Sequence, residues 1–281
     1  MGREKVDGVV EAFATAALGG IAAARGDFKK ALSLQQGALA EVRKLGNRRA
    51  EARLLLALAI LESYLDDRDF KASFARLSEA RTIVAEAADL GLERDQALVA
   101  ATVRYGSTNL RFSRDGDLDA LRALKLSQRL ADPLGVAAAW TLLGAYAQRL
   151  GRPTDAANCL TEAQRIATQA GFAEATFTSL QLRGEFEPDS ARGIVTLRGA
   201  LSLGPAREDP RVRAKTLSDL CRLNSGLGDL DTAWQMHQES AAAVSDYVEK
   251  RSSSSITRAP SNASSSPCAR SHASRAWPSI G

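Results

Sequence analysis

Histidine, cysteine and aromatic residues are all scarce in this sequence. Its 281 residues include two histidines and three cysteines, and Phe, Trp and Tyr together make up 5% of the chain. Cys159, Cys221 and Cys268 are too widely spaced to form a disulfide framework or a metal-binding knuckle. His237 has no second histidine and no paired cysteine near it in the sequence. We therefore expect neither a metal site nor a cofactor.

Strand patterns and long apolar runs are missing as well. No run of β-branched residues alternates with polar ones, so we expect no sheet. The longest apolar runs, such as residues 54–61, fall far short of the roughly 20 residues that a membrane-spanning helix needs. The first residues, MGREKVDG, lack the apolar core of a secretory signal. The sequence therefore predicts a cytoplasmic protein that has no membrane partner.

The common catalytic motifs do not occur either. The phosphate-binding pattern G-x4-G-K-[ST] is absent, and Gly226-Leu227-Gly228 lacks the third glycine of a dinucleotide fingerprint. Acidic residues such as Asp66-Asp67 fall mostly in predicted turns and on outward faces, and helix capping accounts for those near helix starts. Paired acid–base chemistry would need two carboxylates that face each other in a cleft. We therefore expect no enzymatic activity and assign no catalytic residue.

The net charge of +4 does not indicate a nucleic-acid partner. Four of the 37 basic residues, and none of the 33 acidic residues, lie beyond residue 250. The first 250 residues therefore carry 33 charges of each sign, which is not the concentrated basic face that binding to a phosphate backbone requires.

What the sequence does contain is a repeated helical pattern, clearest in residues 137–170. Trp140, Leu143 and Gly144 recur at helical spacing, and a second stripe follows the break at Gly151-Arg152-Pro153. Trp140-x2-Leu143-Gly144 resembles the W-x2-L-G-x2-Y pattern of tetratricopeptide repeats, with Ala147 in the Tyr position and Tyr146 beside it. The resemblance implies that Trp140 and Leu143 are buried, and that Gly144 lets the second helix of the pair approach the first.

Similar helix pairs recur along the chain. The first small residue in the apolar stripe of each second helix falls at Ala31, Ser73, Ala120, Ala156, Gly193 and Ala233. We therefore predict an all-α fold with about six helix pairs, arranged as a right-handed superhelix of the tetratricopeptide type. In the third pair the turn is placed at Gly116-Asp117, and in the fifth at residues 184–190. Trp234 is expected to lie in the core.

The prediction divides the chain into a repeat domain of residues 1–250 and a tail of residues 251–281. The tail is rich in Ser, Arg and Pro and lacks apolar periodicity, so it is expected to be disordered. An alternative is that residues 251–281 are translated from the wrong reading frame, so that the natural chain continues differently after Lys250.

A repeat fold without catalytic motifs favours binding of a protein or peptide on the concave face, which the first helices of the pairs line. Polar positions late in the array are the predicted contacts: Gln148, Lys215, Ser218 and Arg222. Lys215 and Arg222 are taken as exposed residues on one helical face, where an acidic peptide could meet both. Reversing their charge is therefore expected to weaken partner binding and to leave the fold intact. The sequence does not indicate an oligomeric state.

The alternative function is that of a regulatory arm. The array is similar to those that precede diguanylate cyclase domains and to the arms of large bacterial transcription activators. Because no GGDEF motif and no DNA-reading module occur in this chain, no activity follows from that resemblance.

Overall fold

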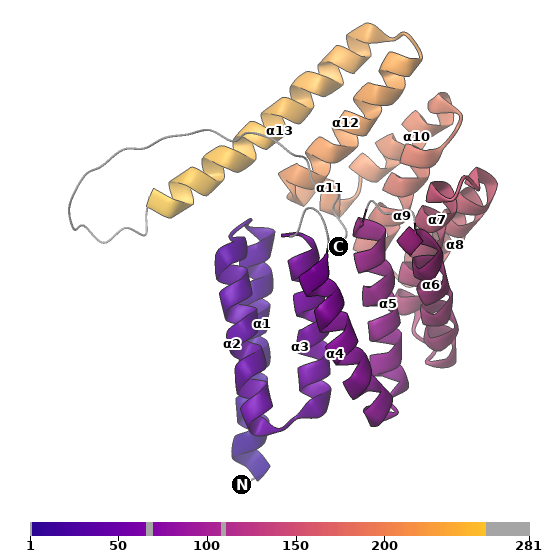
Figure 1. The fold of residues 1–281 in the computed structure, drawn as a ribbon. Coiled ribbons are helices and arrows are strands. Elements are labelled where there is room, and N and C mark those ends of the chain that lie inside the picture. The colour runs from indigo at the N-terminus through magenta and orange to yellow at the C-terminus, as the bar shows by residue number, and fades with distance from the viewer. Residues whose placement is uncertain (1, 66–69, 108–110, 257–281) are drawn as a thin grey trace. The chain divides into compact units, whose positions relative to one another are not determined.

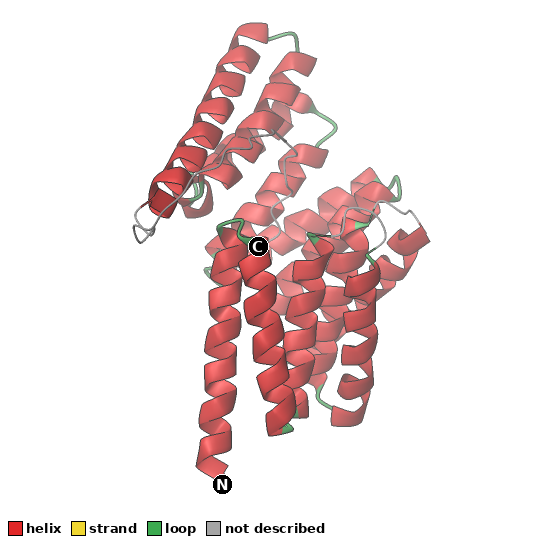
Figure 2. Ribbon diagram, turned by 60° about the vertical axis from the view of Figure 1, so that its left-hand side comes forward, coloured by secondary structure: helices red, strands yellow, loops and turns green. Residues whose placement is uncertain are grey.

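The computed structural model describes residues 2–65, 70–107 and 111–256, and these residues form only helices and loops (Figures 1 and 2). Most of the predicted tail, residues 257–281, lies outside the described residues. The described residues contain thirteen α-helices: α1 (Gly2–Ala24), α2 (Phe28–Leu45), α3 (Arg48–Ser63), α4 (Lys71–Ala87), α5 (Leu90–Gly106), α6 (Arg111–Arg129), α7 (Pro133–Arg149), α8 (Pro153–Gln169), α9 (Ala173–Phe186), α10 (Ser190–Leu201), α11 (Gly204–Glu208), α12 (Pro210–Gly226) and α13 (Leu230–Ile256). The predicted all-α fold is confirmed.

The helices fall into two compact units, residues 1–170 and residues 171–281. In the first unit, α1 packs on α2, α3 on α4, α5 on α6 and α7 on α8, and each pair also contacts the next one. In the second unit, α9 packs on α10 and α12 on α13, with the short helix α11 between the two pairs. The six predicted helix pairs are therefore present, whereas α11 has no counterpart among the helices expected from the sequence.

Capping residues in the sequence set several helix ends. The side chains of Asp27 and Asn47 accept hydrogen bonds from backbone N–H groups three residues further on, at 3.2 and 3.1 Å. Gly46 and Gly151 have φ angles of +69° and +73°, the left-handed conformation that ends a helix and that glycine adopts with least strain. The predicted break at Gly151 is confirmed.

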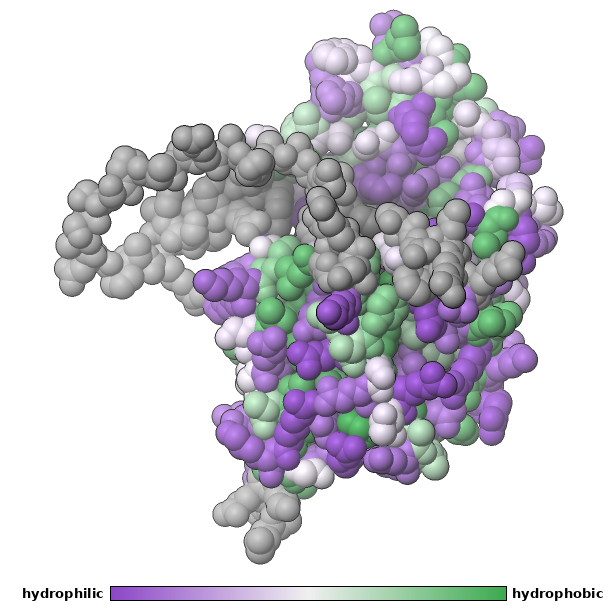
Figure 3. Space-filling model, viewed as in Figure 1, coloured by the Kyte–Doolittle hydropathy of each residue, from purple (hydrophilic) through white to green (hydrophobic). Residues whose placement is uncertain are grey.

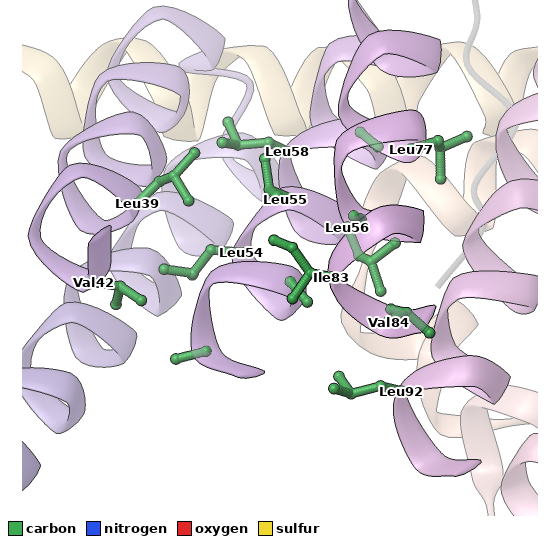
Figure 4. Packing of buried hydrophobic residues seen from close by; sticks show 14 of the residues in the cluster. Leu39, Val42, Leu54, Leu55, Leu56, Leu58, Leu77, Ile83, Val84 and Leu92 are labelled. Atoms are coloured by element: carbon green, nitrogen blue, oxygen red, sulfur yellow. The ribbon is translucent and has the colours of Figure 1, made fainter. Parts of the chain in front are cut away.

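The main core of the first unit lies where α2, α3, α4 and α5 meet. Aliphatic side chains from these helices point toward one another there (Figure 4). Those labelled in the figure are Leu39, Val42, Leu54, Leu55, Leu56, Leu58, Leu77, Ile83, Val84 and Leu92. The apolar stripe of one pair is thus completed by the first helix of the next pair, as stacked repeats require.

The small residue expected at the helix crossing of the fourth pair is confirmed at Gly144. A Cβ atom at this position would lie 2.7 Å from Cγ of Leu160 and 3.2 Å from the carbonyl oxygen of Ala156, both in α8. Leu143 is buried, as expected, but Trp140 is only partly buried at the edge of this core. The fully buried aromatic residue is instead Tyr146.

Three details predicted from the sequence are wrong. Gly116 and Asp117 lie inside α6 and not in a turn. The glycine is needed there because a Cβ atom would overlap the side chain of Tyr146. Gly184 likewise belongs to α9, where a Cβ atom would lie 2.6 Å from Cγ of Leu197. Trp234, expected in the core, is 62% exposed and stacks on His237 with ring centroids 5.5 Å apart.

One segment is long and apolar enough for a membrane span, although we expected none from the sequence. By length and composition alone, Val6–Ala24 could cross a membrane, and only 22% of its most apolar window is buried in the structure. Core helices of soluble proteins and N-terminal signal sequences meet the same criterion. The expectation of no membrane partner therefore stays a prediction.

Candidate functional site

The candidate binding surface of the first unit lies on the first helices of its pairs. α3 packs on α5, and α5 in turn packs on α7, so the sides of these helices that their partner helices leave uncovered lie next to one another. A shallow hollow of about 280 Å³ opens between α3 and α5. Its lining residues are Arg53, Leu56, Ala57, Asp95, Leu98 and Val99.

The floor of this hollow is apolar and its charged groups lie at the edge. Leu56 is buried, while Ala57, Leu98 and Val99 are half-buried and so offer apolar surface to a ligand. Asp95 accepts hydrogen bonds from the guanidinium of Arg94, the shorter at 2.6 Å, which partly neutralises its charge. The hollow is smaller than the roughly 300–1,000 Å³ of small-molecule pockets, and its size suits one apolar side chain.

Gln148 lies on α7, outside the lining of the hollow. Its side chain is half-buried, and its Oε1 atom has no hydrogen-bond partner among the described residues. The neighbouring Arg149 donates to the carbonyl oxygen of Ser107 at 3.0 Å and lies 4.0 Å above the ring of Tyr105. The Oε1 atom of Gln148 is thus a buried acceptor that is unpaired among the described residues.

The other three predicted contacts lie on α12 in the second unit. Ser218 is exposed, and Arg222 is exposed while donating to the carbonyl oxygen of Glu185 at 3.3 Å. Lys215 differs from the prediction, because its ammonium contacts Asp219 at 2.8 Å and Glu185 at 3.2 Å. Burial opposes the charged form, but these two carboxylates raise the pKa of Lys215 above its ordinary value.

Charge reversal at Lys215 is therefore expected to change the fold's stability, contrary to the prediction from the sequence. The Lys215→Glu substitution would place a third carboxylate beside Asp219 and Glu185 in a partly buried site. We expect the free energy of unfolding to fall by about 1–2 kcal/mol, between the values for exposed and buried pairs. Urea unfolding followed by circular dichroism measures it, with exposed Ser218→Glu as the control. Equal midpoints for Lys215→Glu and the wild type would contradict the ion-pair network.

The hollow between α3 and α5 was not predicted from the sequence. Leu56, Leu98 and Val99 belong to apolar patterns that are indistinguishable in the sequence from those of core residues. Only the placement of α3 against α5 shows that Leu98 and Val99 are half-buried there. Arg53 directly precedes the apolar run of residues 54–61, and this exposed charged residue is the sequence signal that lies on the open side of α3.

Two titratable groups near the core around α7 have raised pKa values. Burial raises the pKa of the Cys159 thiol, which disfavours the thiolate that a nucleophile needs. Burial also raises the pKa of Tyr146, whose hydroxyl group donates to the carbonyl oxygen of Ala101 at 2.5 Å. Both groups act as packing residues in this arrangement.

No family model and no curated protein matches the sequence. Solved structures do match the fold. A Rap protein complexed with Competence and Sporulation Factor has a TM-score of 0.65 and 13% identity, with 86% of this chain and 77% of the Rap protein covered. BtubC from P. vanneervenii has a TM-score of 0.58 and 16% identity, with 88% and 99% covered.

A third similar structure is a signal transduction ATPase from Pyrococcus horikoshii that carries a tetratricopeptide repeat sensor. Its TM-score is 0.59 and its identity 15%, and the match covers 88% of this chain but only 42% of the ATPase. With the paired helices described above, these similarities show that the chain has a tetratricopeptide-like repeat fold, a fold that commonly serves protein interaction.

Proposed function

We propose that the protein is a non-enzymatic binding module that holds a peptide or a partner helix on the first helices of its pairs. The observation that carries the proposal is the apolar hollow between α3 and α5, because it lies on the side of the helices that packing leaves uncovered. The similar Rap structure, which is a complex with Competence and Sporulation Factor, supports a binding function for such a repeat array.

The chemistry of the hollow indicates what such a peptide would contain. One leucine or phenylalanine side chain would bury itself on Ala57, Leu98 and Val99. The side chain of Arg53 is exposed at the edge and can meet a carboxylate one turn away on the peptide. In the second unit, we retain Ser218 and Arg222 as polar contacts. Lys215 is not retained, because its ammonium is paired with Asp219 and Glu185.

Filling the hollow should abolish most of this binding. We expect Ala57→Trp to weaken the affinity for selected peptides at least tenfold, which corresponds to about 1.4 kcal/mol. The peptides would come from a random display library selected on the wild-type protein, and titration calorimetry would compare the variants. Selected sequences should share a large apolar residue with an acidic residue nearby.

The matched control is Ala75→Trp, since Ala75 is exposed on α4 and takes no part in the hollow. This variant should bind like the wild type, and both variants should keep the wild-type circular dichroism spectrum. Selection of no peptides, or equal affinity for Ala57→Trp and the wild type, would contradict the proposed site.

A second candidate function is that of a sensor arm in a larger signalling protein of the cytoplasm. The similarity to part of the Pyrococcus horikoshii ATPase, which joins a repeat sensor to other domains, supports it. The test is the gene itself. An output domain encoded in either of the other two frames after codon 250 would support this candidate, and the lack of one in both frames would reject it.

A further inference from the structure

In the first unit, the first helices of the pairs bury the same four positions wherever another pair precedes them. The positions follow the spacing i, i+4, i+8 and i+11. They are Ala50, Leu54, Leu58 and Leu61 in α3, Leu92, Gln96, Ala100 and Val103 in α5, and Gly135, Ala139, Leu143 and Tyr146 in α7. All twelve residues are buried. These positions therefore form the standard surface by which a pair attaches to the one before it.

In α1 the same four positions are all exposed. They are Val10, Ala14, Leu18 and Ile21, with exposed fractions of 62% for Val10, 57% for Leu18 and 49% for Ile21. The alignment follows from Gly19, which contacts Ala31 in α2 as Gly144 contacts Ala156 in α8. We call Val10, Ala14, Leu18 and Ile21 the head face. Figure 3 shows apolar surface among hydrophilic residues over this first pair.

The second helices show the complementary surface. They bury positions j, j+4, j+7 and j+11 against their own partner helix and the first helix of the next pair. The residues are Ala31, Gln35, Ala38 and Val42 in α2, Ser73, Leu77, Ala80 and Val84 in α4, and Gly116, Ala120, Ala123 and Ser127 in α6.

In α13 this surface is half open. Ala233 is buried on α12, but the j+4 and j+11 residues, His237 and Val244, are exposed. Leu230 and Trp234 next to them are 68% and 62% exposed. We call Leu230, Trp234, His237 and Val244 the tail face. Their counterparts in α4 are Phe70, Phe74, Leu77 and Val84, all buried or half-buried.

The junction between α6 and α7 shows how the two surfaces meet. Tyr146, at i+11, packs on Gly116, at position j. At the other end, a Cβ atom on Gly135, at i, would lie 2.5 Å from Oγ of Ser127, at j+11. The same register would place Ile21 against Leu230 and Trp234, and Val10 against Val244.

We propose that the tail face of one molecule packs on the head face of a second copy, so that the copies associate head to tail. Each molecule then supplies one half of a junction that its own interior already contains three times in the first unit. Neither face includes an acid, a lysine or an arginine, so the contact buries no unpaired charge of that kind. Because the two faces differ, the contact is heterologous and one copy leaves an open head and an open tail.

The shape of the surface beside the head face agrees with this occupant. A hollow of about 510 Å³ lies between α1 and the turn before α3, lined by Val6, Val9, Val10, Leu45 and residues 46–49. In the proposed register the part of α13 around Val244 would approach this hollow. A single helix-on-helix contact is smaller than the roughly 800 Å² per partner of standard interfaces, so we expect weak association, with a Kd on the order of 10–100 μM.

The test uses the full chain and two exposed substitutions, one on each face. Trp234→Glu should block the tail face and Leu18→Glu the head face. In sedimentation velocity, the weight-average mass of the wild type should rise with concentration, and each variant alone should stay a monomer. An equimolar mixture of the two variants should form a 1:1 dimer, because each supplies the face that the other lacks. Val195→Glu, at an equally exposed apolar residue of α10, should associate like the wild type.

Other occupants give other results. If α13 pairs with α13 of a second copy, Leu18→Glu still dimerises and the mixture gains nothing. If α1 binds a bilayer, wild type and Trp234→Glu sediment with phosphatidylcholine–phosphatidylglycerol vesicles while Leu18→Glu does not, and no mixture dimerises. Either result, or a monomeric wild type at about 200 μM, well above the expected Kd, overturns the proposal. Circular dichroism must show the wild-type fold for each variant, and Val10→Lys and Val244→Lys provide a second pair.

Discussion

Replacing Tyr146 with Ala is expected to lower the free energy of unfolding by about 3–5 kcal/mol, the range for large buried aromatic residues. The Tyr146 side chain is fully buried, and its ring meets that of Tyr105 edge-on with centroids 5.5 Å apart. Its hydroxyl group reaches the carbonyl oxygen of Ala101 across the α5–α7 contact. Loss of this side chain leaves a cavity where α5, α6 and α7 meet. Urea unfolding followed by circular dichroism at 222 nm gives the value.

The Tyr146→Phe variant separates the hydrogen bond from the ring. It keeps the packing and removes only the hydroxyl group, so the expected loss is about 1 kcal/mol. A second comparison is Trp140→Ala, which should cost less than Tyr146→Ala because Trp140 is only partly buried. Should Tyr146→Ala cost less than about 1 kcal/mol, the junction between the third and fourth pairs is wrongly placed.

Replacing Gly116 with Ala is expected to destabilise the protein by about 2–4 kcal/mol, the upper range for forced overpacking. A glycine inside a helix normally costs about 1 kcal/mol relative to alanine, so the substitution would usually be favourable. Here a Cβ atom would overlap the phenol of Tyr146, with Cε1 at 2.7 Å and the hydroxyl end closer still. The buried, hydrogen-bonded ring has no space to move, so the overlap outweighs the gain in helix propensity and the substitution lowers the free energy of unfolding. Thermal and urea unfolding would both measure the loss.

Gly37 provides the matched control, since it lies inside α2 and a Cβ atom there would have no neighbouring atom within 4 Å. Gly37→Ala should stabilise the protein by about 0.5–1 kcal/mol. Combining Gly116→Ala with Tyr146→Leu should cost less than the sum of the two single substitutions, because the smaller side chain removes the overlap. Strict additivity in this cycle would show that the two residues do not touch.

Much of the fold is predictable from the sequence because the signals that form a helix are local. The stripe around Leu143 and Gly144, the capping residue Asn47 and the helix-ending Gly46 each act within a few residues of chain. Their physics is the 3.6-residue period and the unsatisfied groups of helix ends. All six pairs follow from such local signals.

The features that the sequence could not show depend on distances between residues of different helix pairs. Tyr146 lies one residue from the expected aromatic position, and its partners Gly116 and Ala101 are 30 and 45 residues away. Gly116 therefore resembled a turn residue until its neighbour was known. The prediction that Trp234 lies in the core was wrong for a related reason. Its stripe is that of a core helix, but no later helix among the described residues covers it.

The predicted contact residues also show this limit. Lys215 has the sequence context of an exposed lysine. Only the position of Glu185 on another helix shows that the Lys215 ammonium is already in an ion pair. The hollow between α3 and α5 could be inferred only after the two helices were placed side by side.

The order of the helices along the chain has a kinetic consequence. Within each unit, the contacts in the described residues join helices that are neighbours or next-nearest neighbours in sequence. Chain ends need not find each other before stabilising contacts form, so little loop entropy is lost in the rate-limiting step. Refolding should therefore be fast, on the scale of milliseconds, as in other proteins rich in local contacts. Any two adjacent pairs can serve as the nucleus, and Tyr146→Ala should then direct folding to begin among α1–α4 instead of at the α5–α7 junction.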